Sequence, residues 1–249
     1  MHKLKQWYQD LNLQSKFTLV LLLIVSIPAI AIIFFFYGRA YDMVVSYTIR
    51  QEQDRSAETA PLIEESIQKV LDVSEEISSL DFYQTLFKNA ITDSFTDLAD
   101  SPDAASFSQK VDQLITGTPV TNVKIYMEVP KDSPSDINAL LNKEDLKDTF
   151  LSLDQIRGTY WYGIFRGSRV SQLFCPSFYL GTKEQKAYGD QAYITHASVI
   201  YNNGTYDAYM AVYYSGHDFQ QILSENLTLD GSVSYIMNER NNLVSASSD

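Results

Sequence analysis

Hydrophobic positions are spread unevenly along the chain, and the longest apolar run lies close to the N-terminus. Residues 17–37 are 21 consecutive positions without a charged side chain. At a helical rise of about 1.5 Å per residue this run spans roughly 30 Å, the thickness of a bilayer's hydrocarbon core. A secretory signal has a shorter apolar core that ends before its cleavage site, whereas the A-x-A pattern at residues 29–31 lies inside the run. The pattern predicts a retained transmembrane helix over residues 17–37, with a removable signal peptide as the alternative.

A narrow apolar stripe follows in the polar segment after this span. It consists of Ile63, Ile67, Val70, Ile77 and Leu80, which recur at spacings of three, four and seven residues. These spacings place the side chains on one face of a helix, so we predict a long stalk helix over residues 38–80. Two interpretations are open. In one, the stripe packs on the chain's own globular domain, and in the other it contributes to the seam of a parallel homodimer. The two alternatives do not exclude each other.

Beyond residue 100 the apolar pattern changes from a helical period to short β-rich runs. Residues 120–129 alternate as in a strand, and residues 131–136 are rich in turn formers. Residues 142–151 begin with Asn142 and predict a short capped helix.

The strongest local signal is a pair of β-rich runs at residues 193–201 and 206–214. They flank residues 202–205, where an Asn-Gly pair supplies the positive φ angles of a tight hairpin turn. A helix is predicted next over residues 217–225, with Ser215 and Asp218 spaced as in a capping box, and a second hairpin after residue 232. The predicted fold class is α+β, with an antiparallel sheet and flanking helices.

Charge and composition narrow the possible partners. The net charge is −12 and the pI is about 4.6, which argues against nucleic acid and against docking on anionic lipid. Cys175 is the single cysteine, so an intramolecular disulfide is excluded, and three dispersed histidines predict neither a metal nor a cofactor site. Lysines dominate residues 1–16, whereas the arginines after the span alternate with acids. We therefore expect a cytoplasmic tail over residues 1–16 and an extracytoplasmic chain from about residue 39.

Several segments carry a resemblance to a known family. Residues 7–16 precede an apolar span with a central Ile27-Pro28, and residues 209–214, 217–223 and 235–245 follow in a matching order. This layout resembles the double-Cache sensor region of bacterial membrane receptors, and more narrowly that of YesM-like sensor histidine kinases of Gram-positive bacteria. Where that family has an Asp-Glu-x-Gly turn, this chain has Asn-Glu-Arg-Asn-Asn.

The resemblance implies a distal Cache module, which is PAS-like, over residues 81–227 and the start of an incomplete membrane-proximal module over residues 228–249. No phosphoacceptor-histidine or ATP-binding region is present in the sequence, so we do not expect the chain itself to be an enzyme. The expected function is the signal-input region of a two-component sensor kinase, which detects a small solute or protein signal and relays it through helix rearrangement. The alternative is a membrane-tethered binding or assembly protein without signalling output.

A ligand site is also implied by the resemblance. In Cache domains that bind amino acids, an arginine precedes a Trp-Tyr pair, and a later aspartate meets the ammonium group. Here Arg157 precedes Trp161 and Tyr162, but Tyr213 and Tyr214 occupy the region of the later acid, which disfavours an amino acid. The expected lining of a small-molecule or peptide site is Arg157, Tyr160, Trp161, Tyr162 and Tyr193. The alternative is that these aromatic residues are simply part of the core.

Overall fold

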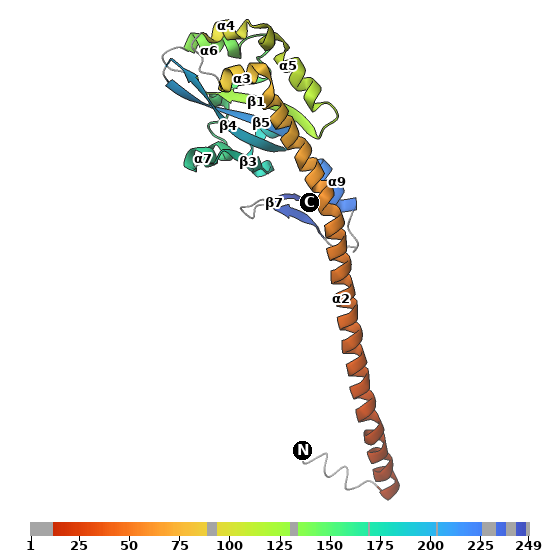
Figure 1. Ribbon diagram of the computed structural model, residues 1–249. Helices are drawn as coiled ribbons and strands as arrows, with labels where there is room; N and C mark the ends of the chain where they lie inside the picture. The colour runs from red at the N-terminus through yellow and green to blue at the C-terminus, as the bar shows by residue number, and fades with distance from the viewer. Residues whose placement is uncertain are drawn as a thin grey trace. The chain divides into compact units, whose positions relative to one another are not determined.

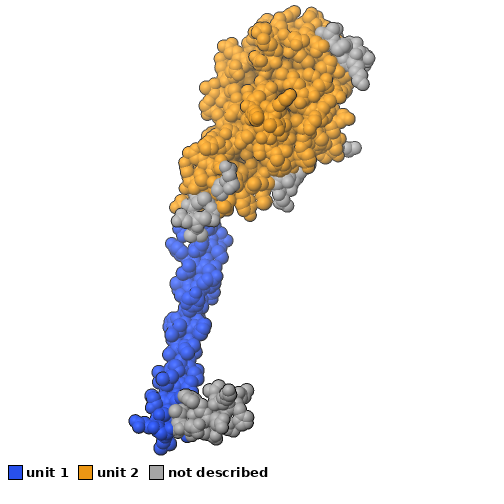
Figure 2. Space-filling view, turned by 180° about the vertical axis from the view of Figure 1, so that it is seen from behind, with its two compact units in different colours: residues 1–54 blue, residues 55–249 orange. Residues whose placement is uncertain are grey.

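The computed structural model describes residues 12–88, 94–129, 134–168, 170–202, 204–225, 233–237 and 243–247 (Figure 1). The chain divides into two compact units, residues 1–54 and residues 55–249, which Figure 2 colours separately. Each unit is considered by itself below.

The first unit is formed by the N-terminal part of helix α2 (Leu13–Ser79). Its apolar side chains face outward, and Leu22, Ile27 and Phe35 each expose about 60% of their surface. Among the described residues, α2 is the one helix that is long and apolar enough to cross a membrane. Pro28 lies within this helix. Helices that span membranes tolerate proline at such interior positions.

The second unit begins with the last turns of α2, whose apolar stripe is buried in a protein core. Ile63, Val70 and Ile77 are buried together with Val73, and Ile67 packs against the same cluster. The prediction that the stripe packs on the chain's own domain is therefore confirmed. The homodimer seam remains a prediction.

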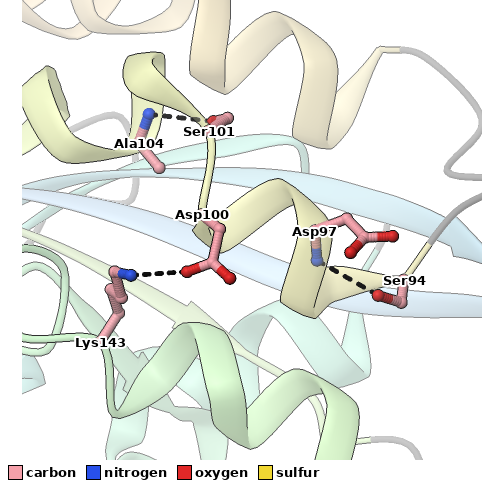
Figure 3. A network of polar contacts seen from close by, with 6 residues as sticks. All are labelled: Ser94, Asp97, Asp100, Ser101, Ala104 and Lys143. Atoms are coloured by element: carbon pink, nitrogen blue, oxygen red, sulfur yellow. Dashed lines mark hydrogen bonds and ion pairs between the residues drawn. The ribbon is translucent and has the colours of Figure 1, made fainter.

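Four short helices follow α2 in the described part of the chain. They are α3 (Asp81–Phe87), α4 (Phe95–Ala99), α5 (Pro102–Ile115) and α6 (Pro134–Leu141). Two of them, α4 and α5, begin with a serine cap. The hydroxyl of Ser94 accepts a hydrogen bond from the Asp97 amide, and that of Ser101 accepts one from the Ala104 amide, both at 3.2 Å (Figure 3). Each cap satisfies an amide that has no partner inside the first helical turn. The Lys143 ammonium also lies 2.6 Å from the Asp100 carboxylate, between the two caps and α6.

The carboxylate of Asp136 joins α6 to two other elements. It accepts hydrogen bonds from the Phe95 and Thr96 amides at 3.0 Å and from the Tyr201 hydroxyl at 2.6 Å. Burial raises the pKa of Asp136, but these hydrogen bonds together lower it by more than burial raises it. The net pKa therefore lies below its usual value. The ionised carboxylate thus holds α4, α6 and the tip of the sheet together.

A five-stranded mixed sheet forms the centre of the second unit. Its strands are β1 (Val120–Met127), β2 (Phe150–Ser152), β3 (Gln172–Cys175), β4 (Gln191–Tyr201) and β5 (Gly204–Tyr214), in the order β2-β1-β5-β4-β3. The α+β fold class is confirmed. The prediction of an antiparallel sheet is wrong at one pair, because β1 and β2 run parallel and are joined through α6.

The predicted hairpin is confirmed as β4 and β5, but the two strands leave only residues 202–203 between them instead of the expected 202–205. Tyr201 pairs with Gly204, so Gly204 is already part of the ladder. Asn202 adopts the positive φ angle of 48° that the turn requires, and asparagine tolerates this conformation better than most residues. Residue 203 lies outside the described residues.

The predicted helix over residues 142–151 is wrong. Helix α6 begins at Pro134, within the segment predicted as turns, and ends at Leu141. Hydrogen bonds from the Lys147 amide to Lys143 and from the Phe150 amide to Leu146 give this segment helix-like turns. At Phe150, however, the chain pairs with β1, and this buried strand pairing prevails over local helix propensity.

Separate hydrophobic clusters cover the two faces of the sheet. The first face packs against α2, α3, α5 and α9 (Gly216–Glu225), where the predicted C-terminal helix is confirmed. At the start of α9, the His217 amide donates a hydrogen bond to the Ser215 hydroxyl. The second face is covered by the short elements η1 (Leu153–Gln155), α7 (Tyr160–Gly167), η2 (Ser177–Tyr179) and α8 (Thr182–Ala187).

A second, two-stranded sheet ends the chain and contains β6 (Tyr235–Met237) and β7 (Leu243–Ala246). This hairpin was predicted, and β7 contacts α9. Residues 226–232, where the membrane-proximal module is predicted to start, lie outside the described residues.

Candidate functional site

Helix α7 places a group of aromatic rings against the second face of the sheet. The Thr159 hydroxyl caps the helix by accepting a hydrogen bond from the Tyr162 amide. Trp161, which is fully buried, packs edge-on against Tyr209 of β5 with ring centroids 5.7 Å apart. Phe165, one turn later, lies 5.1 Å from the same tyrosine ring. The sheet and α7 therefore share an aromatic wall around Tyr209.

A buried carboxylate lies behind this wall. Glu184 of α8 exposes only 6% of its surface and accepts hydrogen bonds from the Tyr213 hydroxyl at 2.6 Å and the Trp161 indole at 3.3 Å. Its second oxygen accepts one from the Gly181 amide at 2.7 Å. Tyr213 also lies 2.9 Å from the Tyr126 hydroxyl. Among the described residues, Glu184 has no ion-pair partner, so neutral donors alone compensate its buried charge.

Burial raises the pKa of both Tyr213 and Tyr126, and the carboxylate of Glu184 raises it further. Both hydroxyls therefore keep their protons throughout the neutral range and remain available as donors. This hydrogen-bond network connects α7, α8 and strands β1 and β5. It holds the aromatic wall in place.

Next to the wall is a cavity of about 390 Å³ that is lined by both polar and apolar residues. Arg166 and Ser168 contribute from the end of α7, and His196, Asp207 and Tyr209 contribute from β4 and β5. The imidazole Nε2 of His196 lies 3.0 Å from Asp207 Oδ1, and the two side chains are each about one-third exposed (35% and 35%). The backbone amide of Asp207 donates to Glu128, 3.2 Å away. The cavity thus combines a positive group on α7, Arg166, with a negative group on the β4–β5 hairpin, Asp207.

Charges at this cavity act on Tyr209. Burial raises its pKa, the Asp207 carboxylate raises it further, and the Arg166 guanidinium opposes the increase. The His196 ring also lies against Tyr209, with centroids 5.1 Å apart. These groups are therefore close enough to meet one small molecule.

The residue types favour recognition of a polar solute. A guanidinium pairs with carboxylate or phosphate oxygens, and an Asp carboxylate accepts hydrogen bonds from hydroxyl or amino groups. Ser168, His196 and Asp207 together resemble the composition of a catalytic triad, but the Ser168 hydroxyl donates to the Ile164 carbonyl at 2.6 Å. A nucleophilic serine instead donates to the histidine that activates it. No group of three or more metal-ligating side chains occurs in the described part of the chain.

The five residues expected to line a ligand site do not meet in one cavity. Arg157 is exposed and pairs with Asp154 at 2.7 Å, and Tyr160 is 62% exposed. Trp161 is part of the core, as the alternative interpretation held, and Tyr162 is half-buried beside Tyr209 at 5.7 Å. Tyr193 lies in the core cluster of the opposite face. Their binding role stays a prediction that this arrangement does not favour.

The sequence of the hairpin contains a signal for this cavity. Once the hairpin turn is fixed, the register places His196 directly opposite Tyr209, and Asp207 lies on the same face two residues before Tyr209. Diagonal neighbours of this kind interact across antiparallel strands. A hairpin with the correct turn therefore predicts the His196–Asp207 pair, whereas Arg166 depends on the tertiary position of α7.

Comparisons of the chain with protein-family models, with curated proteins and with solved structures find no match.

Proposed function

We propose that this chain is a membrane-anchored, extracytoplasmic signal-input region of the double-Cache type, as in a two-component sensor histidine kinase. The observation that carries the proposal is the burial of Val70, Val73 and Ile77 in the same core as the central sheet. The helix that holds these residues also contains the apolar segment. A change in the sheet therefore alters the packing of α2, and α2 is the element that can pass the change to a membrane.

The architecture supports this proposal. A five-stranded sheet with a central hairpin and helices on both faces agrees with the PAS-like layout expected of a Cache module. The parallel pairing of β1 with β2 departs from the antiparallel sheet expected from the resemblance.

We further propose that the signal is a small polar solute with an anionic group, bound in the cavity of Arg166, His196 and Asp207. The guanidinium would hold the anion, and the Asp207 carboxylate would accept hydrogen bonds from the remainder of the ligand. Bound solute would bridge α7 and the β4–β5 hairpin. A modest difference in affinity between two packing states of α2 is sufficient to shift their populations.

In this proposal residues 1–16 are cytoplasmic, residues 17–37 span the membrane and the domain lies outside the cytoplasm. The chain acts as a receptor rather than an enzyme, and a histidine kinase region would provide the output.

A thermal-shift screen of the full chain in lipid nanodiscs tests the ligand. Organic acids, amino acids, sugar phosphates and short acidic peptides would each be added to wild type, to Arg166→Ala and to Arg157→Ala. Arg157 is a matched control because it is an exposed arginine outside the cavity. A solute at 100 times its Kd should stabilise the fold by about 2.7 kcal/mol. We expect this stabilisation to persist in Arg157→Ala and to disappear in Arg166→Ala.

Hydrogen exchange over residues 63–77 tests the relay with the same samples. A ligand that signals through α2 should change the protection of these amides. A ligand that binds without changing them would favour the tethered binding protein over a sensor, and a screen without any hit would refute the solute site.

A further inference from the structure

A second cavity lies on the opposite face of the sheet, where α2, β3 and the C-terminal hairpin meet. It has a volume of about 370 Å³. Ile67 of α2 forms one wall, Gln172 and Phe174 of β3 form another, and Met237 and Val244 of the β6–β7 hairpin form a third. Tyr214 closes the side towards the sheet. The cavity is distinct from that of Arg166, although Val170 lines both and strand β5 contributes to each.

The chemistry of its lining differs from that of the rest of the molecule. None of the described residues that line it carries a charge, although the chain as a whole has a net charge of −12. An ion that entered would lose its hydration without gaining a charged partner, so the lining selects uncharged ligands. The size of the cavity gives a second constraint. Ligand pockets typically occupy about 300–1,000 Å³ and a dry cavity of about 150 Å³ holds benzene, so this cavity has room for a molecule larger than benzene.

A polar group is fixed at the β3 wall of the cavity. The Tyr193 hydroxyl donates a 2.8 Å hydrogen bond to Gln172 Oε1, and the Phe174 ring packs on Tyr193 with centroids 4.6 Å apart. Gln172 is itself exposed, and this contact orients its carboxamide beside a lining whose other members are apolar or aromatic. Apolar walls with a few well-placed polar groups are the usual composition of a small-molecule site.

We propose that this cavity is a binding site for an uncharged, mainly apolar small molecule that exchanges one hydrogen bond with Gln172. The ligand would have the size of a bicyclic aromatic compound and would contact α2, β3 and the C-terminal hairpin at once. The hairpin also contacts α9, and the Gln191 carboxamide donates a 2.7 Å hydrogen bond to the Val244 carbonyl. Bound ligand would therefore tie the hairpin to the buried stripe of α2. This inference goes beyond the solute site proposed above and does not depend on it.

Fluorine NMR with 5-fluoroindole tests the proposal, because this probe is neutral, bicyclic and has one N–H donor. The full chain in lipid nanodiscs would be titrated, and empty nanodiscs would be subtracted. We expect saturable broadening of the fluorine signal with wild type. Val244→Phe should reduce the affinity at least tenfold by filling the cavity, and Gln172→Leu should reduce it about fivefold through loss of the hydrogen bond.

Val233→Phe is the matched control, since Val233 is an exposed residue that precedes β6 and does not line the cavity. Its affinity should stay within twofold of wild type, as should that of Arg166→Ala. Circular dichroism checks the fold of each variant, and Ile67→Phe replaces Val244→Phe if the latter does not fold. Broadening no greater than with empty nanodiscs, or binding unaffected by either filling substitution, would overturn the proposal. A negative result with 5-fluoroindole would not affect the proposal for the Arg166 cavity. A negative Arg166 screen would likewise not affect the proposal for this cavity.

Discussion

Removing one hydroxyl from the buried Glu184 network should have a large effect on stability. Tyr213→Phe keeps the ring in the core but deletes the 2.6 Å hydrogen bond to Glu184 and the 2.9 Å hydrogen bond to Tyr126. A hydrogen bond to a charged group contributes about 1.5–3 kcal/mol, and a neutral one contributes about 0.5–1.5 kcal/mol. Because Glu184 and Tyr126 are both buried, water cannot replace the lost partner. We expect the free energy of unfolding to fall by about 2–4 kcal/mol.

Urea unfolding of the full chain in lipid nanodiscs measures this loss. The emission of Trp161, which donates to the same carboxylate, reports on the network directly in a Trp7→Phe background. With a slope of about 2 kcal/mol per molar urea, the midpoint should fall by roughly 1–2 M. Burial raises the pKa of Tyr213, so the difference should be constant between pH 7 and 9.

Two comparisons make the result interpretable. Tyr160→Phe removes a hydroxyl from an exposed tyrosine on α7 and should change stability by less than about 0.5 kcal/mol. In a Tyr126→Phe background, Tyr213→Phe should cost less than in wild type, because the two residues share a hydrogen bond. A loss below 0.5 kcal/mol in wild type would refute the claim that the Tyr213 hydroxyl compensates the buried charge, and strict additivity with Tyr126→Phe would refute the coupling of the two hydroxyls.

Three further predictions concern the first face of the sheet. Ile77→Ala should lower the free energy of unfolding by about 2–5 kcal/mol, because Ile77 is fully buried, whereas the exposed neighbour Glu76→Ala should have little effect; urea titration distinguishes them. Asp136→Ala should cost about 1–3 kcal/mol and increase amide exchange at Phe95, where it removes an acceptor. Burial raises the pKa of Tyr83 to about 12. The stability that this pKa shift contributes is fully present below pH 10, the usual pKa of tyrosine, and it is lost as the pH rises towards 12. The loss in the free energy of unfolding should be on the order of 3 kcal/mol. Unfolding measured across this range should depend less on pH in Tyr83→Phe, and an unchanged slope would contradict the assignment.

Local signals in the sequence predicted the elements that local chemistry determines. The stripe of α2 is visible because a helix repeats its buried face every three to four residues, and the β4–β5 hairpin is visible because its two strands flank a turn. The segment around Leu146 was predicted wrongly because its turns are helix-like, and only the distant strand β1 makes Phe150 part of a sheet.

The candidate site was predicted less well than the fold. Tyr193 and Trp161 are both aromatic and both buried, yet they belong to opposite faces of the sheet. An error of one residue in the register of β4 would move Tyr193 to the other face, and the face that Trp161 meets depends on how α7 packs, so composition alone cannot assign either side chain to a cavity. Arg166 reaches its cavity through the packing of α7, for which the sequence contains no local signal.

The strand order has a consequence for how the protein is made. Ile125 of β1 pairs with Met210 of the central strand β5, 85 residues later, and the stripe of α2 shares its core with Phe219 of α9. Contacts between such distant positions form slowly because a long loop must close first. At a synthesis rate of about 5–20 residues per second, roughly 7 to 30 s pass between the emergence of Ile77 and that of Phe219. During this interval the apolar stripe can pack only on the part of its core that has already been made, which includes Phe82 and Phe107, so a chain truncated before β5 should be less stable than the full chain and more readily degraded.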